Sequence, residues 1–329
     1  MKKRAAITRP VPAEMNAMAI DKFGPPSVLT PHTVPVPRPG PAEVLIALDA
    51  AGVGIWDAKI RDGSWAEGDV KFPLIMGTDG AGVIVEAGER VRRLAIGDRV
   101  WGYAFGSRKG GFYAEYVAVD ADKVAPVPSH LTMLEAGAGA VTGLTALQGV
   151  VDHLDVRRGE TVLIFGASGA VGTLAVQFAA HYRRARVIAV ASGSKARVLL
   201  AKLGAEAVVD GRARGARDQI EEAAPDGLDA ILALAGSAVL NACVGMLKRG
   251  GRVAYPNGVE PEPRKRPRVR KIGYDAEVNS AALNRLGRAA EAIRLTVPIA
   301  VSYALAQAAK AHARVEHGHL VGRVVLRIR

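Results

Sequence analysis

Residues 161–172 read TVLIFGASGAVG, and this stretch decides the fold. Thr161–Phe165 is a run of apolar and β-branched residues, which predicts a buried strand. Glycines follow at 166, 169 and 172, and an amphipathic helical pattern then runs over residues 170–182. Glycines at this spacing allow a tight turn and a close approach of the backbone to a pyrophosphate, which free amides at a helix N-terminus attract. We therefore predict a dinucleotide-binding unit here; the alternative is a turn chosen only for packing.

The same pattern continues toward the C-terminus. Strand-like runs alternate with helical stretches, of which Lys195–Leu203 is one; the runs are Val187–Ala191, Ala207–Val209, Ala230–Ala233 and Gly251–Tyr255. Buried strands in a β-α-β order are typical of a doubly wound parallel sheet. The fold class is thus α/β, with a Rossmann cofactor domain that we place at residues 140–277.

The sequence before this domain is rich in short strand patterns separated by Gly, Pro and Asp. The clearest are Val44–Leu48, Gly82–Glu86, Arg99–Tyr103 and Phe112–Val119. After the Rossmann domain come a helical stripe over 280–293, a helix near Leu305–Val315 and a strand at Arg323–Ile328. A chain that begins and ends with strands suggests one discontinuous catalytic domain, 15–139 with 278–329. We interpret residues 1–14 as a flexible arm or a misassigned start, with Met15 as the alternative initiator.

The strand after the glycine turn predicts the type of dinucleotide. NAD-binding versions place Asp or Glu at its end, about 20 residues past the turn, to bond the ribose 2′-hydroxyl. This chain has Ala191 there, followed by Ser192, Gly193 and Lys195. A hydroxyl and a cation suit a 2′-phosphate, to which Arg197 is a further candidate. We therefore predict NADP(H); the alternative for Lys195 is an exposed lysine in the first turn of a helix.

Charge and cysteine content narrow the class of protein. The 329 residues carry a formal net charge of +12, but residues 1–14 hold +3 of it and residues 260–271 hold +4. The excess is therefore local, and it lacks interleaved aromatic residues, so nucleic acid is not expected as a partner. Cys243 is the one cysteine, which excludes an intramolecular disulfide framework and any multi-cysteine zinc site. With no signal-peptide pattern and no run long enough for a membrane helix, we expect a cytoplasmic protein.

Several segments together resemble the medium-chain dehydrogenase/reductase superfamily, in its zinc-free quinone oxidoreductase branch. They are AGVGIWD (51–57), PLIMGTDGAGV (73–83), GDRV (97–100), TGLTAL (142–147), the glycine turn, and HLVGRVVL (319–326). The resemblance covers residues 15–329. It implies a β-rich, GroES-like catalytic domain beside the Rossmann domain, with the active site in the cleft between them.

The residues at the zinc positions differ from those of zinc-dependent relatives. Those relatives place a Cys where Gly54 or Ile55 stands and a His where Thr78 stands, and catalytic zinc needs three protein ligands. The seven histidines form no ligand cluster along the sequence. We therefore expect no metal site and no zinc. Without a Lewis acid, oxidation of simple alcohols is disfavoured, and the expected reaction passes a hydride from NADPH to a quinone or similar conjugated carbonyl.

The resemblance also implies which residues contact the cofactor. Ile55 lies near the nicotinamide and Thr142 near its carboxamide side. The expected pyrophosphate contacts are Gly166, Ser168, Gly169, Ala170, Val171 and Gly172. The expected contacts with the adenosine end of the cofactor are Ala191, Ser192, Gly193 and Lys195. Beside the ribose and nicotinamide lie Ala233, Leu234, Ala235, Tyr255, Pro256 and Asn257, and Arg323 returns to the cleft.

Four residues are candidates for the acceptor pocket, and no catalytic residue is assigned. Trp56 and Trp65 could stack on a flat acceptor, or simply pack. Asp57 could relay a proton, or cap a helix. Asn257 follows a strand at the end of the sheet where ligands bind, although asparagine is also common in turns. Two departures from the family pattern concern Gly54, where an Asn is usual, and Asp210 or Gly211, where a Tyr is usual.

Alternatives remain for the function and for the basic loop. The nearest rival is an enone or enoyl-thioester reductase, and a more distant one is a non-catalytic, cofactor-binding protein that binds RNA or a protein. The loop Glu260–Lys271 is either solvated or a lid that meets an anionic acceptor. The strand after it pairs across a dimer in relatives, so a homodimer is expected.

Overall fold

The strand before the glycine turn, β9, lies inside a six-stranded sheet in this computed structural model, which describes residues 10–65, 70–105 and 109–329. The strand order is β11-β10-β9-β12-β13-β14, and every pairing is parallel. The strands are β9 (Thr161–Phe165), β10 (Arg186–Val190), β11 (Ala207–Val209), β12 (Leu228–Ala233), β13 (Leu247–Pro256) and β14 (Arg270–Tyr274). The predicted doubly wound sheet is confirmed.

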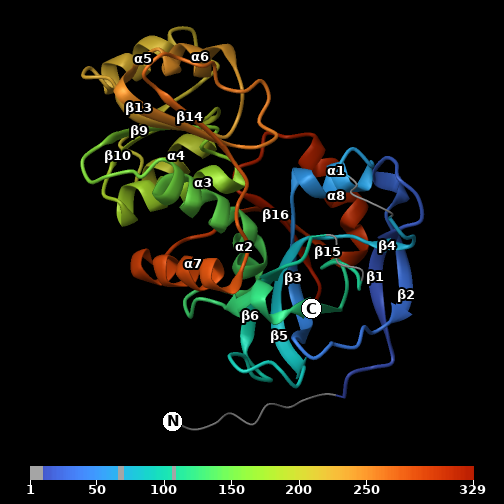
Figure 1. Cartoon of the computed structure of the whole chain (residues 1–329). Coiled ribbons are helices and arrows are strands. Elements are labelled where there is room, and N and C mark those ends of the chain that lie inside the picture. The colour runs from blue at the N-terminus through green and yellow to red at the C-terminus, as the bar shows by residue number, and fades with distance from the viewer. Residues whose placement is uncertain (1–9, 66–69, 106–108) are drawn as a thin grey trace.

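Helices cover both faces of this sheet (Figure 1). One core packs the sheet against α2 (Met133–Gln148), α3 (Ala170–Gln177), α4 (Ser194–Lys202) and α7 (Ser280–Ile293). The other packs it against α5 (Ala216–Ala223) and α6 (Ala238–Val244). Because apolar helices lie on both faces, all five residues of β9 are buried, which explains its unbroken apolar run.

The β-rich part contains a seven-stranded and a three-stranded sheet. The first has the order β15-β16-β3-β5-β6-β8, with β7 paired to β3. Its strands are β3 (Glu43–Val53), β5 (Asp79–Ala87), β6 (Arg99–Tyr103), β7 (Tyr116–Asp120), β8 (Val124–Pro126), β15 (Ile299–Ala304) and β16 (Arg323–Arg327). The second consists of β1 (Glu14–Ile20), β2 (Thr30–Pro35) and β4 (Leu74–Ile75). Two short helices, α1 (Ile55–Arg61) and α8 (Ala308–Glu316), pack together beside them (Figure 1).

Some element boundaries differ from the sequence prediction. The strand expected over Phe112–Val119 begins only at Tyr116, because the amides of Phe112 and Tyr113 bond the loop carbonyls of Gly77 and Met76 instead. The strand expected over Val44–Leu48 extends to Glu43–Val53. Residue 140, the predicted domain boundary, lies inside α2, which contacts both β3 and α3. Of the predicted arm, residues 1–9 lie outside the described residues.

The C-terminal strand brings two distant segments together. β16 pairs antiparallel with β3, and the loop before it meets the glycine turn through a bridge between Gly169 and Gly322. The amide of Gly322 also donates to the carbonyl of Ser168 at 2.9 Å. Arg323 therefore begins β16 beside the turn. In the described part of the chain, no helix is long and apolar enough to cross a membrane.

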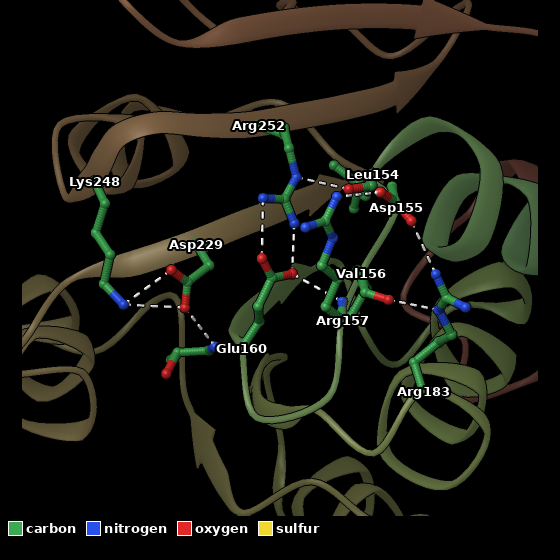
Figure 2. Close-up of polar contacts among 10 residues, drawn as sticks. Leu154, Asp155, Val156, Arg157, Glu160, Arg183, Asp229, Lys248 and Arg252 are labelled. Atoms are coloured by element: carbon green, nitrogen blue, oxygen red, sulfur yellow. Dashed lines mark hydrogen bonds and ion pairs between the residues drawn. The ribbon is translucent and has the colours of Figure 1, made fainter.

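The amino end of the six-stranded sheet carries a group of charges that we call the amino-end cluster: Asp155, Glu160, Arg183, Asp229, Lys248 and Arg252 (Figure 2). Glu160 binds the guanidinium of Arg252, and Lys248 Nζ lies 2.9 and 3.0 Å from the two carboxylate oxygens of Asp229. Arg183 binds Asp155 at 3.0 Å. Each carboxylate of the cluster thus has a cation, and these contacts fasten strand starts and loops to one another.

Candidate functional site

A cavity of about 1200 Å³ lies at the opposite end of this sheet, where β9, β12 and β13 finish. Its walls come from both parts of the fold. Predicted site residues that line it are Ile55, Trp56, Trp65, Thr142, Gly166, Ser168, Gly169, Ala170, Val171, Gly172, Leu234, Ala235, Pro256, Asn257 and Arg323. Predicted residues outside the lining are Asp57, Ala191, Ser192, Gly193, Lys195, Ala233 and Tyr255. The cavity therefore joins the glycine turn to the two tryptophans.

The glycine turn has the geometry that a pyrophosphate needs. Gly166 adopts φ +82°, a conformation that favours glycine, and a Cβ on Gly172 would lie 2.6 Å from the backbone of Ala167. Gly169 is the N-cap of α3, and no side chain caps this end. The first amides of the helix have no partner within it, so they are available to an anion. The residues present fit a dinucleotide phosphate.

At the predicted adenosine end, the structure adds an acidic group. Ser192 Oγ donates to Asp210 Oδ1 at 2.8 Å, and the amide of Arg212 bonds the same oxygen at 3.0 Å. The Arg212 and Ser192 hydrogen bonds lower the pKa of Asp210, so this carboxylate is charged at neutral pH. Asp210 follows β11, one strand away from where an acid is sought in the sequence. The resemblance places Asp210 or Gly211 near the 2′-phosphate, as the position where a Tyr is usual, but the contact of Asp210 with Ser192 depends on parallel strand ends that meet only in the folded sheet.

Two residues of the cavity lining, Trp56 and Arg323, belong to a polar group with Asp57, Thr78 and Asp79, which we call the cleft network. The indole of Trp56 donates to Thr78 Oγ1 at 2.7 Å, and Thr78 Oγ1 donates to Asp57 Oδ1 at 3.2 Å. The other oxygen of Asp57 accepts from the amide of Gly54 at 2.7 Å, which caps α1. Burial, with the charge of Asp79, raises the pKa of Asp57 to about 7. Asp57 thus helps to hold the indole of Trp56 in place through Thr78.

Arg323 is the second anchor of this network. Its Nη2 donates to Asp79 Oδ1 at 2.8 Å, and its guanidinium carbon lies 4.6 Å from the centre of the Trp56 ring. Both members of the ion pair are buried, at 2% and 0% exposure. Nevertheless, Arg323 Nε and Nη1 and Asp79 Oδ2 have no hydrogen-bond partner. Buried polar atoms without partners are rare, and Arg323 directly follows Gly322, which bridges to the glycine turn.

A second row of buried polar residues stands behind Asp57. Arg61 Nη1 donates to His312 Nδ1 at 3.2 Å, which leaves the proton of the neutral ring on Nε2, 3.3 Å from Tyr113 Oη. Burial, with the charge of Arg61, lowers the pKa of His312 to about 3, so its ring is neutral. Arg61 also binds Glu316 at 2.7 Å. These contacts hold α1 against α8. Arg61 cannot accept a proton, so the row cannot relay protons.

The remaining candidates near the cleft are held by neighbours. Asn257 Nδ2 donates to Asp275 at 2.7 Å, and Tyr255 Oη donates to Glu262 at 2.9 Å. Glu262 also binds Lys271 at 2.6 Å, so part of the basic loop is paired. Arg266 of the same loop donates to the carbonyls of Val244 and Leu247. These contacts hold part of the loop against the six-stranded sheet.

The donor set at the zinc positions does not fit zinc. Gly54 and Ile55 have no ligand atom in their side chains, and the hydroxyl of Thr78 is engaged by Trp56 and Asp57. The two nearby carboxylates are bound by Gly54, Thr78 and Arg323. Within the described residues, no three His, Cys, Asp or Glu side chains gather as a metal site would require.

Sequence reasoning missed several residues of the site. Lys59 lines the cavity, and Asp79, Tyr113 and His312 support its wall. The spacing of Gly54 and Asp57 is a helix-start signal that predicts α1 and thus places Lys59 one turn on. Tyr113 and His312 carry no local signal, because nearly 200 residues separate them in the chain.

Comparison with known proteins gives two matching family models. Residues 40–129 match the alcohol dehydrogenase GroES-like domain, and residues 203–326 match the family described as zinc-binding dehydrogenase. The first match confirms the predicted GroES-like part.

Relatives extend the match along the chain. A rat quinone oxidoreductase is 33% identical over 242 residues, which cover 73% of this chain and 72% of the relative. An NADPH-dependent alkenal/one oxidoreductase of Arabidopsis thaliana is 28% identical over 324 residues, 96% of this chain and 80% of the relative. A mycobacterial protein solved with NADPH superposes with a TM-score of 0.81 at 26% identity, over 95% of this chain and 100% of that one.

Proposed function

This chain belongs to the quinone oxidoreductase-like branch of the medium-chain dehydrogenase/reductase superfamily, and from that premise we propose that it reduces a quinone or similar conjugated carbonyl with NADPH, without zinc. Relatives named for quinones and for alkenals and enones support the acceptor class. A solved neighbour that holds NADPH supports the cofactor. The function class is therefore an NADPH-dependent oxidoreductase, and the finer acceptor and the zinc independence are the proposal.

The observation that carries the proposal is the junction of the glycine turn with Arg323. The bridge between Gly169 and Gly322 sets a guanidinium with two unpaired N–H groups beside the free amides of α3. The glycine turn and Arg323 both line this one cavity. A dinucleotide pyrophosphate satisfies both at once.

The chain's own residues then divide the work. Gly169, Ala170, Val171 and Arg323 would hold the pyrophosphate, and Thr142 and Asn257 line the cavity beyond them. When bound, the cofactor supplies the hydride. Thr78, supported by Asp57, holds the indole of Trp56 in place, and the ring packs against the guanidinium of Arg323. A flat acceptor would lie against this part of the cavity wall. Catalysis of this kind depends mainly on positioning.

Zinc independence rests on the donor chemistry of the wall. Gly54 and Ile55 supply no ligand, and Thr78 Oγ1 already has two partners. A conjugated carbonyl accepts hydride without a metal, whereas an alcohol substrate needs its oxygen activated. Under this proposal, the name of the matched family, zinc-binding dehydrogenase, does not imply metal binding by this chain.

The test is a comparison of acceptors with the purified protein. Oxidation of NADPH is followed at its near-ultraviolet absorbance with a small quinone, an enone and a crotonyl thioester, before and after treatment with a zinc chelator. We expect turnover with the quinone and no loss on chelation. Absence of turnover with all three acceptors would contradict the proposal, and loss of activity on chelation would contradict its zinc-free part.

The second candidate is an enone or enoyl-thioester reductase. The Arabidopsis relative named for alkenals and enones favours it. The same assay separates the two, since this candidate predicts faster turnover with the enone or the thioester than with the quinone.

Three further proposals concern the setting of the enzyme. β14 is an edge strand of the six-stranded sheet, and we propose that it supports a homodimer, which light scattering would test. A cytoplasmic location remains a prediction, which fractionation of expressing cells would test. RNA binding is the remaining alternative for the basic segments, and a binding constant without a steep salt dependence would exclude it.

A further inference from the structure

Two glycines at the end of β3 leave room for a pair of large side chains. A Cβ built on Gly54 would overlap the indole of Trp56, 2.5 Å from Cζ2 and 2.6 Å from Cδ2. A Cβ built on Gly52 would lie 2.5 Å from Nη2 of Arg323. The two glycines are two residues apart in an extended segment, so their side-chain positions lie on the same face. The ring and the guanidinium therefore lie next to each other on backbone that carries no side chains.

The need for glycine at position 54 comes from the indole and not from the backbone. Gly54 has φ −113° and ψ 164°, a conformation that any residue adopts. The family pattern has an Asn at this position, and an Asn side chain would need the space that the ring of Trp56 occupies. The departure from the family pattern is therefore explained by the place of Trp56.

Hydrogen bonds hold both members of this pair. Trp56 Nε1 donates to Thr78 Oγ1 at 2.7 Å, and Arg323 Nη2 donates to Asp79 Oδ1 at 2.8 Å. The guanidinium carbon of Arg323 lies over the Trp56 ring, 4.6 Å from its centre, which is within the range of a cation–π contact. Because Nη2 is bound and the ring covers the guanidinium, the directions of Nε and Nη1 are set as well. These are the two nitrogens of Arg323 that have no hydrogen-bond partner.

We propose that Trp56 is a positioning residue for cofactor binding, whose indole holds the guanidinium of Arg323 in the orientation that meets the dinucleotide pyrophosphate. The inference rests on the proposed function, which assigns the pyrophosphate to Arg323 and the glycine turn. Gly54 is the residue that permits this place of the ring. The role differs from stacking on the acceptor, because the ring acts through Arg323 and needs no contact with a substrate.

The geometry of a guanidinium decides how well it binds a phosphate. Two parallel N–H groups of an arginine can bind two phosphate oxygens at once, so a rotation of the guanidinium loses a hydrogen bond although the charge remains. Removal of the Trp56 ring would leave a space beside Arg323 into which the guanidinium can turn. The expected effect therefore falls on ligands that contain the pyrophosphate and spares those that lack it.

The experiment measures the binding of two ligands to the protein without cofactor. The first, 2′-phospho-ADP-ribose, contains the pyrophosphate but no nicotinamide, and the second, adenosine 2′-monophosphate, contains no pyrophosphate. The variants are Trp56→Leu, which removes the ring, Trp56→Phe, which keeps an aromatic face, and Gly54→Ala, which adds one methyl group where the indole lies. Gly287→Ala in α7, where a Cβ would lie at an ordinary 3.9 Å from Pro126, is the matched control. Thermal melting checks that each variant folds.

We expect Trp56→Leu and Gly54→Ala each to weaken the binding of 2′-phospho-ADP-ribose about tenfold, and Trp56→Phe to weaken it by less than about threefold. Gly54→Ala should have no further effect when combined with Trp56→Leu, because the methyl group then displaces no ring. Binding of adenosine 2′-monophosphate should not change in any variant. Equal affinity of Trp56→Leu and the parent protein for 2′-phospho-ADP-ribose would overturn the inference. Equal weakening of both ligands would overturn it too, because it would show a general disturbance of the fold.

Failure of the proposed function is distinguishable from failure of this inference. If the parent protein binds 2′-phospho-ADP-ribose but oxidises NADPH with none of the acceptors, the proposed function is wrong, and the binding series still decides the role of Trp56. If the parent protein turns over, Trp56→Leu should raise the KM for NADPH more than it lowers kcat. A fall in kcat with an unchanged KM for NADPH would place the ring on the acceptor, which leaves the proposed function intact and overturns the inference. A parent protein that does not bind 2′-phospho-ADP-ribose would overturn both.

Discussion

At the amino end of the six-stranded sheet, each carboxylate of the amino-end cluster meets a cation (Figure 2). Around the cleft, the carboxylates and cations are less completely paired. Asp79 and Arg323 pair with each other but retain three unpaired polar atoms between them. Asp57 is bound by an amide and a hydroxyl, and Asp210 by a hydroxyl and amides, without an ion pair in the described residues.

The charges of the amino-end cluster stabilise the fold, whereas polar atoms of the cleft network are left without partners and are suited to bind a ligand. A buried N–H without a partner costs about 1–3 kcal/mol, so an arrangement that leaves several unpaired is retained where another molecule completes it. The amino-end cluster needs no such completion. The cleft network does, and its Arg323 lines the same cavity as the glycine turn.

The largest effect should follow from breaking the buried ion pair. Arg323→Met leaves Asp79 charged and buried, and we expect it to lower the free energy of unfolding by about 3–5 kcal/mol and to abolish tight NADPH binding. Urea unfolding and a fluorescence titration with NADPH measure the two effects. Arg327→Met, at the exposed end of the same strand, is the control.

A second substitution separates stability from binding. Adding Asp79→Asn to Arg323→Met removes the uncompensated charge, so part of the lost stability should return while NADPH binding stays lost. Recovery of binding in the double variant would argue that Arg323 serves the fold alone.

The next effect concerns the pH dependence of stability. Because burial raises the pKa of Asp57 to about 7, the folded protein binds a proton at this site where the unfolded chain has released it. The stabilisation is full below about pH 4, the usual range for Asp, and is lost as pH rises to about 7. We expect Asp57→Asn to reduce this fall in the free energy of unfolding by up to about 4 kcal/mol.

The measurement for Asp57 is urea unfolding of both proteins at several pH values between 4 and 8, quoted as the difference between them so that other titrating groups cancel. An identical pH dependence in the two proteins would mean that Asp57 stays ionised between pH 4 and 8. Its hydrogen bonds to Gly54 and Thr78 would then stabilise the charged form more than burial disfavours it.

The parallel sheet could be predicted from the sequence because its signals are local. The apolar run Thr161–Phe165 and the glycines after it specify strand, turn and helix within a few residues. Helix α2 had a local signal too, since Thr132 and Glu135 form a capping box that marks its start. The strand expected at Phe112 failed because its amides bond a loop far away in the chain.

The candidate site could be predicted only in part, for the same physical reason. Residues that follow strands, such as Ser168 and Asn257, reach the cavity because parallel strands end at one edge. Asp210 and Arg212 were missed as neighbours of Ser192, since their contact depends on the register of β10 with β11. The contact of Lys59 with the Trp65 ring could not be predicted either, because it depends on how the chain folds back after α1.

A smaller effect is expected at the amino end. Glu160→Gln breaks the pair with Arg252, whose side chains are 19% and 15% exposed, and should cost about 1–3 kcal/mol of stability without changing NADPH affinity. The matched control is Glu206→Gln, which breaks an exposed pair with Arg186 and should cost at most about 0.5 kcal/mol. Denaturant unfolding measures both. A loss of NADPH binding in Glu160→Gln would remove the distinction between the two ends.

The smallest effect is expected at Asp210, the half-buried carboxylate at the predicted adenosine end. Asp210→Asn removes a negative charge beside Ser192 while its amide oxygen can still accept the serine hydroxyl. Since a 2′-phosphate placed at Ser192 would be repelled by that charge, we expect NADPH to bind about threefold more tightly and NADH not to change, with the gain fading at high ionic strength. Titrations of both dinucleotides at low and high salt measure this. An equal change for NADPH and NADH would place Asp210 on the ribose that they share. A gain that persists at high salt would mean that the carboxylate acts through the shape of the loop and not through its charge.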